Sequence, residues 1–186
     1  MSQSYARVEK QRYTYDDYCS WQDDKRWELI DGVPYAMSAP TVRHQRIAGR
    51  LFTKFFIFLD GKPCEAFIAP LDVILNPEGE KNIVVQPDII VVCDSSKLDD
   101  KACRGTPDLI IEILSPSTSS IDTVVKFNRY QEAGVKEYWI VNPESNWIQV
   151  FRLNDGVYNA HTYGEEDTIP VGIIEDFEIN LQEIFE

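Results

Sequence analysis

The clearest alternation of apolar and polar positions lies in TVRHQRIAGRLFTKFFIFL, residues 41–59. At about 100° per residue the apolar side chains gather on one side, which predicts an amphipathic helix with His44 on its apolar side in the first turn. The residues predicted to share the apolar face are Ala48, Leu51, Phe52, Phe55, Phe58 and Leu59. The basic residues of a narrow arc away from that face are Arg43, Arg46, Arg50 and Lys54. This arc is typical of a solvated face, and contact with a DNA backbone is the second interpretation.

Short runs rich in β-branched residues predict strands in the middle of the chain. These runs are CEAFIAPLDVIL (64–75), NIVVQPDIIVVC (82–93) and PDLIIEIL (107–114). The last two contain few polar residues, which suits strands that are covered on both faces. Pro116 ends the third run, because proline cannot continue a ladder. SSIDTVVKFNRYQEAG (119–134) then predicts a helix that begins at a Ser119 or Ser120 cap and ends at Gly134.

The remaining segments complete the expected order of elements. Thr14 before YDDYCSWQ predicts a capped short helix, and RWELI-DG-VPYAM predicts a hairpin with an Asp-Gly turn. KEYWIVN, WIQVFRL and GVYNAHTY predict further strands, and LQEIFE predicts a final short helix. This order indicates an α/β fold, in the sense of α+β with a mixed sheet. With 186 residues, we expect one domain spanning 1–186.

Charge and cysteine usage limit the classes of function. The net charge of −13 argues against a general nucleic-acid-binding surface, although clustered carboxylates can bind metal. No apolar run reaches the roughly 18 residues of a membrane span, and the N-terminal segment has no apolar core of a secretory signal. The four cysteines are scattered without a C-x-x-C pair, so disulfides are possible but not indicated. We therefore predict a cytoplasmic protein without a membrane partner.

Glu112 is the residue that points to chemistry, because it interrupts the apolar run of residues 109–114. A buried carboxylate is costly unless a partner compensates it. Asp108 would lie about 13 Å away on the same strand, too far to share one metal ion. Asp88 lies in the preceding run, and its carboxylate converges with that of Glu112 if the two strands pair. Asp88 and Glu112 then form a plausible Mg²⁺ site with water and a substrate phosphate.

Metal-assisted cleavage of a phosphodiester also requires a cation near the attacking water or the phosphate. In a compact D/E-x-K motif this lysine would occupy position 114, which is leucine here. The following helix offers replacements. Asp122, Lys126 and Arg129 lie within about 60° of one another on a regular helix, and Tyr130 is one step further round.

Several segments, in this order, resemble the Uma2 family, formerly DUF820, of the PD-(D/E)xK restriction-endonuclease-like superfamily. They are WELIDGVPYAMSAPTVRHQRI, VVQPDIIVV, PDLIIEILSPST and DTVVKFNRYQEAGVKEYWIVNP. The resemblance covers roughly residues 12–182 and is most specific from Pro107 to Pro143. It implies a restriction-endonuclease-like core, with a central mixed β-sheet flanked by helices, plus an N-terminal helix and hairpin.

The resemblance also implies roles for single residues. Asp88 matches the aspartate of the PD motif, and Glu112 matches its D/E. Lys126 matches a lysine displaced from the strand to the helix. Glu28 matches an acidic residue on the N-terminal element, and His44 matches the histidine that opens the next helix. Tyr130 matches a recurrent tyrosine.

Together these features predict an endonuclease that depends on Mg²⁺ or Mn²⁺ and hydrolyses DNA. Asp88 and Glu112 would bind the metal, Lys126 would orient water, and Glu28 and His44 would complete the catalytic set. The alternative is a non-catalytic binding or assembly module on the same scaffold, which the acidic charge favours. A homodimer is also expected, and the aromatic segments KEYWIVN and WIQVF are candidates for its interface.

Overall fold

A six-stranded mixed sheet forms the centre of the fold in a computed structural model that describes residues 11–22, 24–115 and 121–186. The strand order is β11-β10-β9-β8-β6-β3, and the β8–β9 pair is parallel while the other pairs are antiparallel. The strands are β3 (Glu65–Ile68), β6 (Ile89–Val92), β8 (Leu109–Ile113), β9 (Glu137–Asn142), β10 (Trp147–Asn154) and β11 (Val157–Gly164). The predicted mixed sheet is confirmed.

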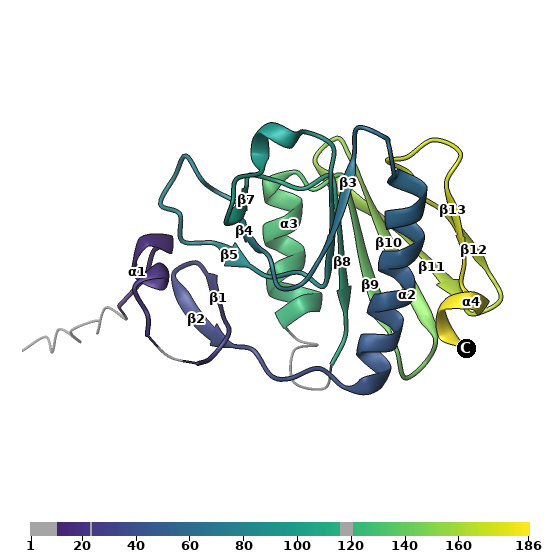
Figure 1. Cartoon of the computed structure of the whole chain (residues 1–186), viewed down its shortest axis with the longest axis horizontal. Helices are drawn as coiled ribbons and strands as arrows, with labels where there is room; N and C mark the ends of the chain where they lie inside the picture. Colours follow the sequence, from purple (N-terminus) through teal and green to yellow (C-terminus); the bar gives the residue numbers. More distant parts are fainter. Residues whose placement is uncertain (1–10, 23, 116–120) are drawn as a thin grey trace, which may run out of the picture.

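Helices cover both faces of this sheet (Figure 1). Helix α2 (Val42–Leu59) packs Leu51 and Phe55 into a core cluster on one face, together with Ile111 of β8. Helix α3 (Phe127–Ala133) packs Tyr130 into the cluster on the other face, with Ile110. Neighbouring residues of β8 point to opposite faces, so the strand is buried throughout, as its apolar run predicted.

A second sheet lies at the N-terminal side of the molecule and was not expected. Its five strands have the order β2-β1-β5-β4-β7. They are β1 (Trp27–Ile30), β2 (Val33–Ala36), β4 (Asp72–Ile74), β5 (Val84–Val85) and β7 (Ala102–Arg104). Helix α1 (Tyr15–Cys19) begins at Thr14 with a capping box, and Asp31 and Gly32 turn the β1–β2 hairpin with φ of 54° and 72°. The predicted first helix and hairpin are therefore confirmed.

Two of the predicted strand runs each divide into two strands. Residues 64–75 form β3 and β4, and residues 82–93 form β5 and β6, with one member of each pair in each sheet. The divisions fall at Pro70, which follows a cis peptide bond, and at Pro87. Proline has no N–H for a ladder, so both uninterrupted predictions were wrong at these points.

The helix predicted for residues 119–134 has two parts. A π-helical segment, η2 (Ile121–Lys126), comes first, and α3 follows and ends at Gly134 in the left-handed conformation, with φ of 83°. The predicted caps Ser119 and Ser120 and the side chain of Asp122 lie outside the described part of the chain. The other short elements are η1 (Ser95–Lys97), β12 (Thr168–Pro170), β13 (Glu178–Asn180) and the predicted terminal helix α4 (Gln182–Phe185).

Cys64 and Cys93 form a disulfide, which corrects the expectation from their scattered positions. They are 29 residues apart in sequence. The β3–β6 register pairs Glu65 with Val92, so the two cysteines face each other one step further along. A pairing across antiparallel strands leaves no local spacing signal in the sequence.

The aromatic segments proposed for a dimer interface belong to the protein's own sheet. KEYWIVN contains β9, which lies between β8 and β10 and is buried along most of its length. Trp139 and Tyr138 of β9 enter the two core clusters, so their apolar area is already covered within the chain. The buried part of KEYWIVN is therefore not accessible to another copy, while an interface through WIQVF stays a prediction. Within the described part of the chain, none of the helices combines the length and the hydropathy of a membrane span.

Candidate active site

The pairing of β6 with β8 brings Asp88 and Glu112 together, as the sequence predicted. The antiparallel register pairs Ile89 with Ile111, and one further step places Asp88 opposite Glu112. The backbone N–H of Ile113 donates to Asp88 Oδ2 at 2.8 Å, which extends the contact beyond the last ladder pair. Both carboxylates line a pocket of about 190 Å³ at this end of the sheet.

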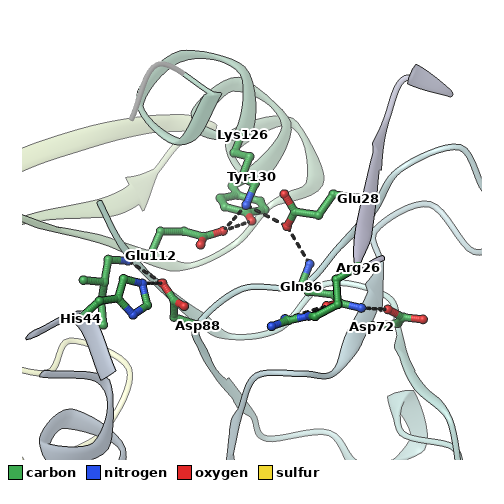
Figure 2. A network of polar contacts seen from close by, with 10 residues as sticks. Arg26, Glu28, His44, Asp72, Gln86, Asp88, Glu112, Lys126 and Tyr130 are labelled. Atoms are coloured by element: carbon green, nitrogen blue, oxygen red, sulfur yellow. Dashed lines mark hydrogen bonds and ion pairs between the residues drawn. The ribbon is translucent and has the colours of Figure 1, made fainter. Parts of the chain in front are cut away.

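Lys126 lies between two carboxylates that come from different sheets (Figure 2). Its Nζ is 2.8 Å from Glu28 Oε1 and 2.9 Å from Glu112 Oε1, and the lysine side chain is 3% exposed. Two carboxylates around one ammonium leave a local charge of −1. A buried ammonium at this depth is stable because it is paired. The η2 segment therefore places an ammonium beside Glu112, while position 114 carries leucine.

Tyr130 and Gln86 hold these two carboxylates in position. The Tyr130 hydroxyl donates to Glu112 Oε1 at 2.7 Å, and the Gln86 backbone N–H donates to Glu28 Oε1 at 2.8 Å. Burial, followed by the negative charges of Glu112 and Glu28, raises the pKa of Tyr130 well above its ordinary value. The phenol therefore stays protonated and acts as a hydrogen-bond donor at neutral pH.

His44 enters the site from the first turn of α2. Thr41 caps this helix by accepting from the His44 N–H at 3.2 Å, which fixes where the turn begins. His44 Nε2 lies 3.2 Å from Asp88 Oδ2, and the imidazole is buried. The structure thus brings together all five predicted site residues, in two contact groups: His44 with Asp88, and Lys126 with Glu28 and Glu112.

A further network of hydrogen bonds lies next to Glu28, and it was not predicted from the sequence. Arg26 donates from Nε and Nη2 to Gln86 Oε1, at 2.9 and 2.7 Å. Gln86 Nε2 in turn donates to Asp72 Oδ1 at 2.8 Å and to the Tyr18 hydroxyl at 3.2 Å. Two signals were present: Gln86 directly precedes the Pro87-Asp88 pair, and Arg26 is two positions before Glu28, on the same side of an extended strand.

The other basic candidates serve contacts within the chain. Arg43 donates to the Pro143 carbonyl, Arg50 to the carbonyls of Ile184 and Glu186, and Lys54 to Glu183. Three members of the predicted basic arc thus connect α2 to neighbouring segments. Arg129 pairs with Asp31 and Glu132, while Tyr130 contacts Glu112. Lys126 and Tyr130 are four residues apart, so both side chains can reach Glu112 from one face of the helix, whereas Arg129 points to Asp31 and Glu132.

Asp88 and Glu112 have the chemistry that Mg²⁺ or Mn²⁺ requires. Carboxylate oxygens are hard ligands, and Mg²⁺ commonly takes one or two of them and completes its shell with water and substrate oxygens. Among the residues that the structure describes, no three His, Cys, Asp or Glu side chains form a metal-binding group. The two carboxylates therefore fit a metal ion that takes its remaining ligands from water and substrate, and not one that is bound by protein side chains alone.

The mixed sheet with helices on both faces and acidic residues at one end agrees with the restriction-endonuclease-like core that the resemblance implied. A crystal structure from Anabaena variabilis ATCC 29413, described as a "putative nuclease belonging to DUF820", has the same fold with a TM-score of 0.76. The match has 18% identity and covers 93% of this chain and 97% of the other.

The chain belongs to the Uma2 family, described as "Putative restriction endonuclease", whose model matches residues 14–182. It is also similar to an uncharacterized protein, slr1290, of Synechocystis sp. (strain ATCC 27184 / PCC 6803 / Kazusa). The two are 32% identical over 143 residues, which is 75% of this chain and 74% of the relative. The resemblance noted in the sequence is confirmed.

Proposed function

We propose that the protein is a Mg²⁺- or Mn²⁺-dependent endonuclease that hydrolyses phosphodiester bonds in DNA. The observation that supports this most directly is the convergence of Asp88, Glu112 and Lys126 in one pocket. Family membership supports a nuclease of the restriction-endonuclease type. The single domain over residues 1–186 is part of the same proposal.

In this proposal Asp88 and Glu112 hold the metal, which supplies Lewis acidity toward the phosphate and a more acidic water when bound. Lys126 holds a positive charge beside Glu112, where it can orient the attacking water and stabilise negative charge on the phosphate. Tyr130 keeps Glu112 in its orientation through a 2.7 Å hydrogen bond. His44 positions the Asp88 carboxylate, and Glu28 fixes Lys126 from the second sheet.

The test is cleavage of supercoiled, linear duplex and single-stranded DNA with Mn²⁺ or Mg²⁺, by wild type and Glu112→Ala purified in parallel. We expect cleavage by wild type and its loss in the variant. Asp108→Ala is a matched control, because it removes an equally buried carboxylate from the other end of the same strand. Equal cleavage by wild type and Glu112→Ala would contradict the proposed site, since a contaminating nuclease would account for both.

A second candidate is a non-catalytic binding or assembly module on this scaffold. The net charge of −13 and the pairing of Lys126 with two carboxylates favour it. Calorimetric titration with Mg²⁺ and Mn²⁺ separates the two candidates. Heat of binding that disappears in Asp88→Asn supports the enzyme, whereas absence of binding at millimolar metal supports the module.

The homodimer and the cytoplasmic location stay predictions from the sequence. Gel filtration with light scattering measures the oligomeric state. The cellular location can be tested by fractionation, and thiol labelling of the intact cells reports whether Cys64 and Cys93 are oxidised there. An oxidised pair would argue against a reducing compartment, because structural disulfides are rare in one.

A further inference from the structure

A phosphodiester that enters the pocket brings negative charge to a wall that already carries carboxylates. The acidic and basic residues that line the pocket are Arg26, Glu28, His44, Asp88, Glu112 and Lys126. The chain as a whole has a net charge of −13, so no general surface potential draws DNA toward this end of the sheet. Local basic side chains must therefore compensate the phosphate charge beyond whatever a bound metal supplies.

Of the basic groups among the described pocket residues, Arg26 is the exposed one. Lys126 is 3% exposed and its Nζ contacts both Glu28 and Glu112. His44 is buried and contacts Asp88. Arg26 is an exposed residue that still lines the pocket, and its guanidinium binds the Gln86 amide rather than a buried carboxylate, so a ligand at Arg26 need not displace a buried ion pair.

The backbone places Arg26 rigidly beside the site. Trp27 pairs with Ala36 in the β1–β2 ladder, and the Met37 N–H donates to the Arg26 carbonyl at 2.9 Å, which extends this ladder by one step. Arg26 and Glu28 are two positions apart on the extended segment, so their side chains leave the same face. Figure 2 shows Arg26 and Gln86 next to Glu28, on the same side of the network.

The side chain of Arg26 is oriented before any ligand binds. Gln86 Oε1 accepts from both Nε and Nη2 of Arg26, while Gln86 Nε2 donates to Asp72 Oδ1. A guanidinium only donates and a carboxylate only accepts, so the Gln86 amide has one orientation that satisfies both. These bonds use two of the five N–H donors of the guanidinium, which leaves donors for an oxyanion.

We propose that Arg26 contacts a phosphate of the DNA substrate, held in position for this contact by Gln86. The inference rests on the proposed function and deepens it, because it assigns the residue that binds the anionic backbone next to the metal-binding carboxylates. Arg26 is a substrate-binding residue in this assignment, and Gln86 is a positioning residue that acts through it.

The test measures binding of a fluorescein-labelled 20-base-pair duplex by anisotropy at several salt concentrations. Ca²⁺ replaces Mg²⁺ and Mn²⁺ so that binding is measured apart from cleavage, and a gel verifies that the DNA stays intact. For Arg26→Ala we expect Kd to rise about tenfold or more, since a charge-assisted contact is lost. The slope of log K against log salt should decrease by about 0.9, the value for one phosphate contact.

Two further variants sharpen the result. Arg26→Lys keeps the charge without the planar donors, so we expect it to restore the salt slope but only part of the affinity. Lys25→Ala removes a neighbouring positive charge from a residue that does not line the pocket, and its slope should match that of wild type. Circular dichroism melting verifies that each variant is folded, and Arg26→Gln replaces Arg26→Ala if the alanine variant is not.

The outcomes separate this inference from the proposed function. Wild-type binding with the same Kd and slope in Arg26→Ala would overturn the role of Arg26 and leave the nuclease proposal intact. No binding of DNA by wild type would overturn the nuclease proposal, and the inference with it. An equal decrease in slope for Lys25→Ala and Arg26→Ala would show a general charge effect and would also overturn the specific contact.

Discussion

The two ends of the β6–β8 strand pair carry the same dipeptide in the same structural position. Pro87-Asp88 precedes β6 and Pro107-Asp108 precedes β8, and antiparallel pairing puts the two aspartates at opposite ends. Asp88 Oδ2 accepts from the backbone N–H of Ile113, and Asp108 Oδ2 accepts from that of Cys93, both at 2.8 Å. Each aspartate thus binds the backbone at the end of the neighbouring strand.

The surroundings of the two aspartates differ. Asp88 lines a pocket beside His44 and opposite Glu112. Asp108 pairs with Lys136, whose side chain is 68% exposed, and the Cys64–Cys93 disulfide lies at its end of the sheet. The comparison shows that a Pro-Asp pair marks the start of a strand at both ends. In the ranges that the structure describes, a candidate site is present only at the Asp88 end, where α2, η2 and β1 contribute His44, Lys126 and Glu28.

Removal of the same charge from both aspartates should have the largest effect and should differ between the two ends. Asparagine keeps an oxygen that accepts the backbone N–H, so both Asp88→Asn and Asp108→Asn remove a charge and keep this hydrogen bond. The two variants then differ in the role of the charge that is lost. We expect Asp88→Asn to lower the Mn²⁺-dependent cleavage rate by about 10²- to 10³-fold, as for the loss of a transition-state contact. Asp108→Asn should stay within about threefold. Initial rates on one DNA substrate measure both, and similar losses would remove the distinction between the ends.

Removing the two lysines compares a buried ion pair with an exposed one. Lys126→Met leaves Glu28 and Glu112 buried together without their ammonium, so we expect a loss of about 3 kcal/mol in the free energy of unfolding. Cleavage should fall by about 10²-fold. Lys136→Met loses an ion pair whose lysine is mostly in solvent, which should cost about 1 kcal/mol or less. Urea unfolding measures the difference; equal midpoints for the two variants would contradict it.

Tyr130→Phe tests a hydrogen bond at the site end and has a defined pH dependence. The lost bond to a charged Glu112 should cost about 1.5 kcal/mol and lower cleavage less than tenfold. Because the pKa of Tyr130 is raised in the folded protein, its neutral form stabilises the fold fully below the unfolded tyrosine pKa of about 10. This contribution is lost as pH rises above that value.

The measurement for Tyr130→Phe is the difference in unfolding free energy between wild type and variant from pH 7 to 11. Wild type should lose more stability than the variant above about pH 10. Other tyrosines with raised pKa values, such as Tyr15 at about 12, are present in both proteins and cancel in the difference. A constant difference across this range would contradict the assignment.

The smallest effect on cleavage is expected at the disulfide end. Cys64→Ser with Cys93→Ser opens a cross-link between residues 29 apart, which should cost about 3 kcal/mol in stability from chain entropy. Cleavage below the melting temperature should stay within about twofold, because the disulfide lies at the end of the strands away from Asp88. Melting curves and rates on the same samples measure both. A large loss of rate in a folded variant would show that the two ends are coupled.

The sequence predicted the parts of the fold that depend on local pattern. The α2 stripe, the Thr14 cap, the Asp31-Gly32 turn and the apolar β8 run all formed as predicted, because each depends on residues close in the chain. The pairing of the strand that follows Asp88 with the strand that carries Glu112 was the condition for their convergence, and the β6–β8 ladder confirms this pairing. These features account for the central sheet, both covering helices and the carboxylate pair of the site.

Features set by distant residues could not be predicted. Pro70 and Pro87 divided two runs between sheets, and a sequence pattern cannot show to which sheet each half belongs. The π-helical geometry of residues 121–126 also left no signal in the sequence pattern, which predicted one regular helix. The Arg26–Gln86–Asp72 network depends on the packing of one sheet against the other, and the Cys64–Cys93 pair depends on strand register.

The two proline-marked crossings have a mechanical consequence for the pocket. The chain passes between the sheets at residues 69–71 and again at residues 86–88, and the Ala69 N–H donates to the Asp88 carbonyl at 2.9 Å, which ties one crossing to the other. Glu28 belongs to one sheet and Glu112 to the other, with Lys126 between them. Two short covalent connections therefore join the sheets beside the pocket, and their length limits how far apart the two carboxylates that share Lys126 can lie.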